Sequence, residues 1–202
     1  MNVNIALLTV TDTRTLKTDK SGNILVDKIS EANHNLVDRK ICKDSKKAIK
    51  KILKDWIKKK KIDVIITTGG TGLTGRDITP EALDEIADKH IPGFGEVFRT
   101  ISLKTVGTSS IQSRVCAVLA NGKYIFALQG SSGGVTDAWI EILVHQLDIN
   151  HKPCNFVELF PRLKEKYNFN LFPLLQYKLQ RLQLKIQIYQ LNLNFLLKIY
   201  KP

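Results

Sequence analysis

Hydrophobic residues follow two different periods along this chain. Short runs of β-branched and aliphatic residues, typical of strands buried on both faces of a sheet, alternate with longer segments in which apolar residues recur every three or four positions. The runs predict strands at 5–10, 36–42, 63–68 and 124–128, and the longer segments predict helices at 22–33, 45–60, 80–89 and 135–147. Residues 93–120 predict a short helix, a loop and another helix. This order predicts a three-layer α/β/α domain with a mostly parallel central sheet.

A glycine-rich loop follows the predicted strand at 63–68. Gly69-Gly70-Thr71-Gly72 comes first, then Arg76 and Asp77, and Thr79-Pro80 predicts a helix start with Thr79 as N-cap. Open α/β sheets bind ligands at the carboxyl ends of such strands. Glycines let backbone N–H groups approach an anion, and a nearby carboxylate can hold a cation against it. We therefore predict a ligand loop; the alternative is a tight turn that is rich in glycine.

Two nucleotide-binding motifs fit this loop incompletely. Residues 70–75 satisfy G-x-G-x-x-G, the fingerprint of nicotinamide-dependent oxidoreductases, but the predicted helix begins after the glycines and not within them. No strand ending in an acidic residue follows about 20 residues later to bind a ribose. The phosphate-loop motif needs a lysine after its last glycine, where this chain has Arg76. Both motifs are therefore disfavoured.

Four loops are expected to meet at one edge of the sheet, because the carboxyl ends of parallel strands lie together. These loops span residues 11–14, 43–44, 69–79 and 129–134. Together they offer backbone N–H donors, hydroxyl groups, carboxylates and arginine. Such a set suits a phosphorylated ligand and a divalent cation.

Charge is distributed unevenly over the 202 residues, whose formal net charge is +12. Residues 46–61 form a lysine-rich helix that we interpret as a solvated surface, since lysines without interleaved aromatic residues are weak support for nucleic-acid binding. No acidic residue occurs after Glu165. We therefore divide the chain into a folded domain, 1–165, and a basic, apolar tail, 166–202, which we expect to be poorly ordered.

Cysteine usage and hydropathy favour a cytoplasmic protein. Cys42, Cys116 and Cys154 are far apart and odd in number, which suits unpaired, buried thiols in a reducing compartment. The apolar run at 5–10 is too short for a signal peptide. No stretch approaches the roughly 20 apolar residues of a membrane span. We expect a core domain that binds neither membrane nor nucleic acid.

Several longer motifs resemble one family of proteins. They are LLTVTDTR at 7–14, TTGGTGLTGRDITPEAL at 67–83, PGFGEVFR at 92–99, GTSSIQSRVCA at 107–117 and HKPCNF at 151–156. The chain resembles the MoaB/MogA family of molybdenum cofactor biosynthesis proteins over about residues 3–165, and the motifs at 92–99 and 151–156 are most similar to the MoaB branch.

The resemblance implies a function, a set of ligands and an assembly. It implies a trimer or hexamer that binds molybdopterin and, with Mg-ATP, converts it to adenylyl-molybdopterin and pyrophosphate. The implied catalytic and Mg²⁺-binding residues are two carboxylates, Asp77 and Asp44. The implied binding residues are Gly69, Gly70, Thr71 and Gly72 of the first glycine loop, Ser113 and Arg114 near the pterin, and Gly130 and Ser131 of a second loop.

Alternatives stay open for both carboxylates and for the activity. Asp77 could instead be a helix-entry carboxylate stabilised by the helix dipole, and Asp44 could instead be the N-cap of the helix at 45–60. Gln129 stands where the family has a proline before the second glycine loop. The alternative function is a molybdopterin-binding and assembly protein of the same pathway that does not catalyse adenylylation.

Overall fold

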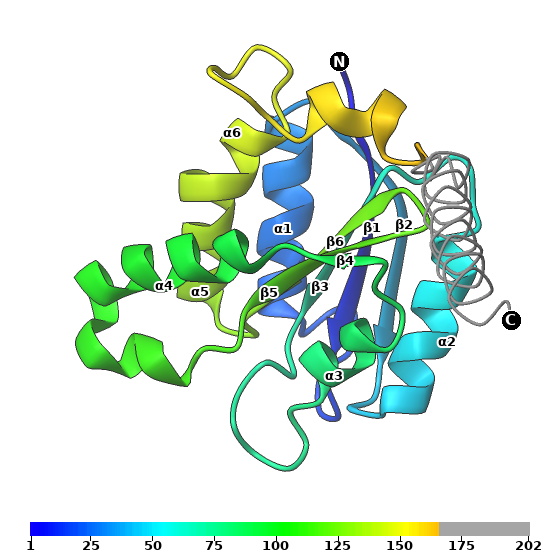
Figure 1. The fold of residues 1–202 in the computed structure, drawn as a ribbon. Coiled ribbons are helices and arrows are strands. Elements are labelled where there is room, and N and C mark those ends of the chain that lie inside the picture. The colour runs from blue at the N-terminus through cyan, green and yellow to red at the C-terminus, as the bar shows by residue number, and fades with distance from the viewer. Residues whose placement is uncertain (166–202) are drawn as a thin grey trace, which may run out of the picture. The chain divides into compact units, whose positions relative to one another are not determined.

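A six-stranded sheet with the order β2-β1-β3-β6-β5-β4 lies at the centre of the fold (Figure 1). The computed structural model describes residues 1–165, so the expectation for the tail at 166–202 lies outside the described residues. The strands are β1 (Asn4–Val10), β2 (Asn35–Cys42), β3 (Val64–Thr68), β4 (Lys89–His90), β5 (Cys116–Ala120) and β6 (Lys123–Leu128). β2, β1, β3 and β6 are parallel, whereas β5 pairs antiparallel with β6 and β4 pairs antiparallel with β5. The predicted, mostly parallel sheet is confirmed.

Helices cover both faces of this sheet and make three layers (Figure 1). The α-helices are α1 (Lys20–Glu31), α2 (Lys46–Trp56), α3 (Thr79–Asp84), α4 (Pro92–Val106), α5 (Ser132–Ala138) and α6 (Val144–Gln146). Short helical segments of other types are η1 (Gly107–Gln112), η2 (Trp139–Leu143) and η3 (Val157–Arg162). α1, α4 and α5 pack on one face, and α2 and α3 pack on the other. The predicted α/β/α arrangement is confirmed.

The central strands are apolar on both sides because each side faces a layer of helices. In β1, Ile5 and Leu7 point into the core under α1, while Ala6 and Leu8 point into the core under α2. β3 is buried at every position. The continuous apolar runs in the sequence therefore reflect two separate cores, because successive side chains of a strand point to opposite faces of the sheet.

The second helix predicted within 93–120 is wrong, since residues Cys116–Ala120 form strand β5. A short apolar run fits a buried strand as well as a helix, and periodicity cannot separate the two. The two residues that follow this run, Asn121 and Gly122, indicate a strand. Asn121 has a φ of 49° and Gly122 a φ of 70°, and they join β5 to β6 as a tight antiparallel hairpin. Asn-Gly between two apolar runs is a strong indication of such a turn.

Two predicted helices end earlier than expected. α2 ends at Trp56 and not at Lys60, and α3 ends at Asp84 and not at Lys89. Lys89 instead belongs to β4, which pairs with β5 at the edge of the sheet. Long-range pairing of this kind is invisible to a helical period counted along the chain.

Two other helices begin earlier than expected because side chains cap them. α1 begins at Lys20, since the Asp19 carboxylate accepts a hydrogen bond from the Gly22 N–H. α5 begins after Ser131, whose hydroxyl accepts from the Gly134 N–H. Both caps lie at the carboxyl edge of the parallel strands, where they shape the site described below.

The cysteines are only partly as expected. Cys42 and Cys116 are half-buried and unpaired, but Cys154 is exposed, so its predicted burial is wrong. Burial raises the pKa of the Cys42 thiol to about 11 and that of Cys116 to about 12, which keeps both in the unreactive thiol form. Within residues 1–165 no helix is long and apolar enough to cross a membrane.

Candidate functional site

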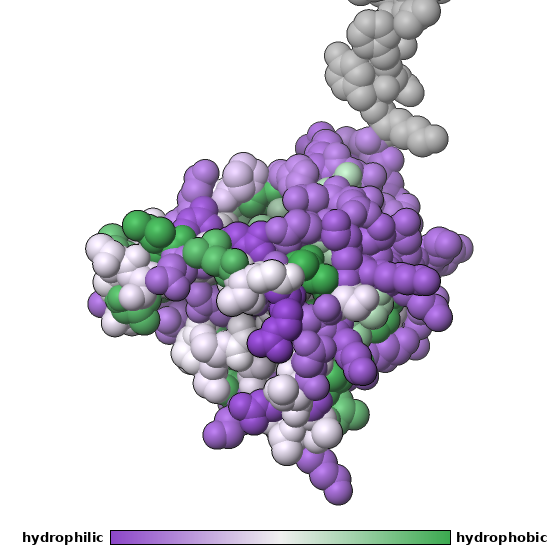
Figure 2. All heavy atoms as spheres, turned by 90° about the horizontal axis from the view of Figure 1, so that it is seen from below, coloured by the Kyte–Doolittle hydropathy of each residue, from purple (hydrophilic) through white to green (hydrophobic). Residues whose placement is uncertain are grey.

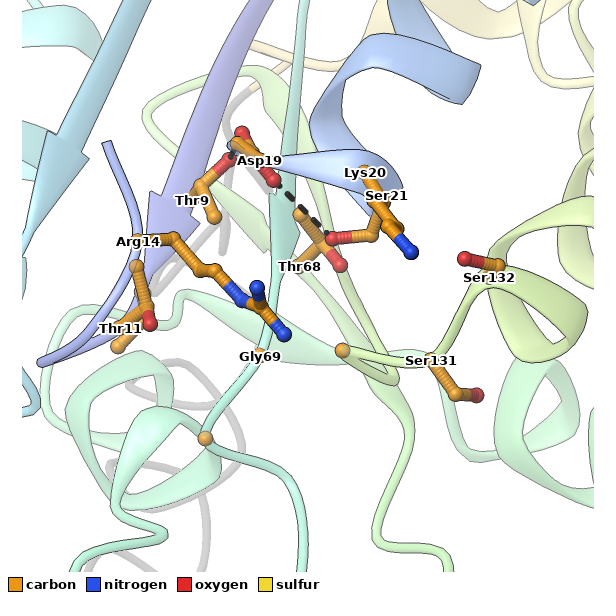
Figure 3. Close-up of a pocket in the computed structure, with 13 residues that line it drawn as sticks. Thr9, Thr11, Arg14, Asp19, Lys20, Ser21, Thr68, Gly69, Ser131 and Ser132 are labelled. Atoms are coloured by element: carbon orange, nitrogen blue, oxygen red, sulfur yellow. Dashed lines mark hydrogen bonds between the residues drawn. The ribbon is translucent and has the colours of Figure 1, made fainter. Parts of the chain in front are cut away.

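A cavity of about 410 Å³ opens where β1, β3 and β6 end. Figure 3 shows residues that line it. The predicted meeting of the loops at 11–14, 69–79 and 129–134 is thereby confirmed, since residues of all three line it. Four of the predicted binding residues belong to its wall: Gly69, Gly70, Gly130 and Ser131. The face that contains this edge of the sheet is largely hydrophilic (Figure 2). The cavity is therefore built for a polar ligand.

Two cationic side chains, Arg14 and Lys20, also line the cavity. The Arg14 guanidinium points into it from the loop after β1, and Lys20 comes from the first residue of α1 (Figure 3). Hydroxyl groups of Thr68, Ser21 and Ser132 add polar oxygens from three different elements. A small cavity with two cations, hydroxyl groups and glycine backbone suits a phosphorylated ligand.

Asp19 holds the start of α1 against β1 and was missed by sequence reasoning, which began this helix at residue 22. Its buried carboxylate accepts hydrogen bonds from Thr9 Oγ1 at 2.6 Å, from the Gly22 N–H at 2.9 Å and from Arg39 Nη2 at 3.0 Å. Burial acts to raise the pKa of Asp19, but these hydrogen bonds and the Arg39 charge outweigh it and lower the pKa. The charged carboxylate thus places Lys20 beside the cavity.

Gly69 and Gly70 have positive φ values of 100° and 66°, which side-chain-bearing residues rarely adopt. A Cβ on Gly69 would lie 2.2 Å from the Val10 carbonyl oxygen, and one on Gly70 would lie 2.5 Å from Thr79 Oγ1. Thr79 is not the N-cap that the sequence predicted, because Ile78 precedes α3 and Thr79 is its first residue. Its hydroxyl instead donates to the Gly69 carbonyl at 2.9 Å, which fixes the loop.

We expect Gly69→Ala to destabilise the domain by at least about 2 kcal/mol, because it adds a backbone clash to a strained φ. The matched control is Gly75→Ala in the same loop, where a Cβ would meet nothing within 4 Å among the described atoms. Chemical denaturation of both variants tests this. Equal midpoints would contradict the tight geometry at Gly69.

Asp77 is bound within its own loop. Its carboxylate accepts hydrogen bonds from the Thr74 N–H at 2.9 Å and from Thr74 Oγ1 at 2.6 Å. Partial burial acts to raise the pKa of Asp77, but the Thr74 and Gly72 hydrogen bonds and the Arg114 charge lower it overall. The Asp77 carboxylate is thus held by Thr74 and Gly72 within the loop that precedes α3.

Asp44 carries a carboxylate oxygen without a hydrogen-bond partner. Asp44 Oδ1 is buried and unpaired within the described residues, and a Cβ on Gly70 would lie 2.7 Å from it. Ser45 occupies the N-cap position of α2, so the capping alternative for Asp44 is wrong. Burial raises the pKa of Asp44, and the negative charges of Asp12 and Asp77 raise it further. Asp44 therefore lies beside the glycine loop as a carboxylate that a cation would stabilise.

Asp44 and Asp77 fit a Mg²⁺ site in which substrate phosphates and waters supply the other ligands. Across residues 1–165 no group of three or more His, Cys, Asp or Glu residues is arranged to hold a metal ion. Mg²⁺ commonly binds through one or two carboxylates together with substrate phosphates and waters. Asp44 offers an unpaired carboxylate oxygen, and the negative charge of Asp77 raises the pKa of Asp44. These two carboxylates agree with a site that has one or two protein ligands.

Ser113 and Arg114 lie outside the cavity wall formed by Gly69 and Gly130. They line a second cavity of about 430 Å³, together with Arg99 of α4. The Ser113 hydroxyl is buried without a partner among the described atoms. The Arg114 N–H donates to the carbonyl of Thr71 at 3.1 Å. The predicted pterin pair is thus joined to the glycine loop by the hydrogen bond between Arg114 and Thr71.

Comparison with known proteins identifies the family. A family profile described as "Probable molybdopterin binding domain" matches residues 6–149. Over 161 residues, which are 80% of this chain and 93% of the relative, the sequence is 44% identical to molybdenum cofactor biosynthesis protein B of Escherichia coli (strain K12). The chain belongs to the MoaB/MogA family of molybdenum cofactor biosynthesis proteins.

Solved structures of MoaB and MogA proteins share the fold. A crystal structure of molybdenum cofactor biosynthesis protein B superposes with a TM-score of 0.71 at 40% identity, covering 73% of this chain and 92% of that one. A structure of MogA has a TM-score of 0.66 at 30% identity, covering 72% and 95%. The resemblance predicted from the motifs is confirmed.

Gln129 is the position at which this member departs from the family pattern predicted above. Its carbonyl accepts a hydrogen bond from Thr68 Oγ1 at 2.7 Å, which ties the ends of β3 and β6 together. Its side-chain Oε1 packs over Gly134, where a Cβ would lie 2.3 Å away. The Gln129 side chain therefore supports the second glycine loop by contacts, where a proline would support it by a rigid φ.

Proposed function

We propose that this MoaB/MogA-family protein binds molybdopterin and adenylylates it with Mg-ATP, giving adenylyl-molybdopterin and pyrophosphate. The observation that carries the proposal is the cavity at the carboxyl edge, where two cations and two glycine loops meet next to Asp44. Family membership supports molybdopterin as the ligand. The polyanionic substrates of this reaction match the charge of the cavity.

The roles of the binding residues follow from their chemistry. Arg14 and Lys20 would pair with phosphate oxygens, and the backbone of Gly69, Gly70 and Gly130 would approach them closely. Ser131 would add a hydroxyl. Thr71, Gly72 and Ser113 belong to the proposed pterin side of the site, next to Arg114.

The reaction needs orientation and charge neutralisation more than proton transfer. A phosphate monoester is mostly dianionic at neutral pH, because its second pKa is about 6. One of its oxygens attacks the α-phosphorus of ATP, and the bond from that phosphorus to the bridging oxygen breaks to release pyrophosphate. When bound, Mg²⁺ supplies positive charge to the triphosphate. Asp77 and Asp44 would hold that ion, and the loop amides would orient the phosphates.

The second candidate function is molybdopterin binding and assembly without adenylylation. Gln129 favours it, because the second glycine loop rests on contacts of the Gln129 side chain in place of the predicted proline. Under this alternative the same cavity binds ligand but does not align a triphosphate for attack.

Incubation of the full chain with molybdopterin and Mg-ATP separates the two functions. We expect stoichiometric pyrophosphate release and an adenylylated pterin detectable by mass spectrometry. The control omits molybdopterin and measures hydrolysis of ATP alone. Tight molybdopterin binding without pyrophosphate would establish the binding function in place of the enzyme.

We further propose a cytoplasmic homo-oligomer, a trimer or hexamer. Hydrophobic side chains gather on the projecting end of α4 and η1, at the left of Figure 2. Leu103, Val106 and Ile111 are 53%, 55% and 78% exposed in the single chain. Contacts between copies are the usual way to bury such side chains.

A further inference from the structure

Every nitrogen of the Arg114 guanidinium contacts the loop between β3 and α3 or the first turn of α3. Nε donates to the Gly72 carbonyl at 2.7 Å, and Nη2 donates to the Asp77 carbonyl. Nη1 forms an ion pair with Glu81 of α3. The planar fork of arginine can serve these acceptors at once, which a lysine cannot do.

These contacts close the loop around Asp77. The carbonyls of Gly72 and Asp77 are held by one side chain, while the Asp77 carboxylate turns back to Thr74. A Cβ on Gly72 would lie 2.7 Å from Asp77 Oδ2, so the two ends of this segment lie very close together. Movement of Arg114 would therefore release both ends of the segment that carries Asp77.

We propose that Arg114 is a positioning residue that holds the Asp77 carboxylate in place. Its guanidinium is itself oriented by the ion pair with Glu81. The proposal rests on the proposed function for its catalytic consequence. It differs from the role implied by the family resemblance, in which Arg114 lies near the pterin as a binding residue. The guanidinium is committed to the protein, and its side chain is only 30% exposed.

Hydrogen exchange of the ligand-free protein tests the positioning step without any turnover. Three backbone amides report on the loop. The Thr74 N–H donates to Asp77 Oδ2, and the Asp77 N–H donates to the Thr74 carbonyl. The Thr79 N–H donates to the Gly70 carbonyl. We expect Arg114→Ala to speed exchange in the peptide 71–79 at least tenfold and Glu81→Gln to speed it less. Lys152→Ala, which removes an exposed ion pair with Glu158, is the control and should leave this peptide unchanged.

Binding and kinetics then separate positioning from ligand contact. With Arg114→Ala we expect kcat to fall at least tenfold and the Mg²⁺ requirement to rise, while the Kd for molybdopterin changes less than threefold. Arg114→Lys should recover only part of kcat. Wild-type exchange at 71–79 with a raised molybdopterin Kd would overturn the proposal and establish a binding role. If the wild-type protein releases no pyrophosphate, the proposed enzyme fails, yet unchanged exchange in Arg114→Ala would still overturn the positioning of the loop.

Discussion

Asp77→Ala is expected to abolish adenylylation, lowering kcat by about 10³-fold, which corresponds to about 4 kcal/mol of transition-state stabilisation. The physical reason is that the variant removes negative charge that we place beside the triphosphate and its cation. Molybdopterin binding should stay within a few fold of the wild type, because Asp77 is not proposed to contact the pterin. Pyrophosphate release and equilibrium binding measure the two effects on the same preparation.

Asp77→Asn separates charge from loop structure. The amide oxygen can still accept the hydrogen bonds from Thr74, so the loop should persist while the charge is lost. We expect nearly the same loss of kcat as for alanine. Asp84→Asn, at the exposed end of α3, is the matched control and should keep full activity. Full adenylylation by Asp77→Ala would remove this residue from the reaction.

Asp19→Ala is expected to destabilise the domain by about 3–5 kcal/mol, because it leaves the partly buried Arg39 without its counter-ion. It also removes the cap of α1 and the acceptor for Thr9. For a domain of this size the melting temperature should fall by roughly 10 °C. Differential scanning calorimetry measures the shift, and Asp27→Ala, at an exposed site on α1, should shift it by less than about 2 °C.

The pH dependence of stability provides an independent test of the same carboxylate. The folded-state pKa of Asp19 is lowered from 3.8, so the folded protein holds its proton less tightly than the unfolded chain. The resulting stabilisation is present above the unfolded pKa and is lost as the pH falls through the folded pKa. The gap in stability between the wild type and Asp19→Ala should therefore narrow on acidification below about pH 4. A constant gap would show that Asp19 acts by packing alone.

Some elements could be predicted from the sequence because their signals are local. The buried runs at β1, β3 and β6 are continuous in the chain, and their order with intervening helices predicts a parallel sheet. Gly69 and Gly70 stand out because few other residues tolerate their backbone angles. Strand β5 was missed, since five apolar residues carry no period that separates strand from helix.

The glycine loop could be predicted from the sequence, but the cavity beside it could not, because only the loop is contiguous in the chain. The glycine loop and Asp77 are contiguous, whereas the cavity also depends on Asp19, which joins β1, α1 and Arg39 of β2. No spacing along the chain connects those three elements. The capping alternative for Asp44 was removed only by the observed start of α2 after Ser45.

The sequence by itself determined the α/β/α class, the family and the loop at which a phosphorylated ligand is expected, because hydrophobic period, glycine clusters and long motifs are local properties. Only the tertiary structure decided which side chains share the cavity, that Arg14 and Lys20 face it, and that the Arg114 fork is bound to the loop of Asp77. Those facts depend on contacts between residues far apart in the chain, which form when two cores pack against one sheet.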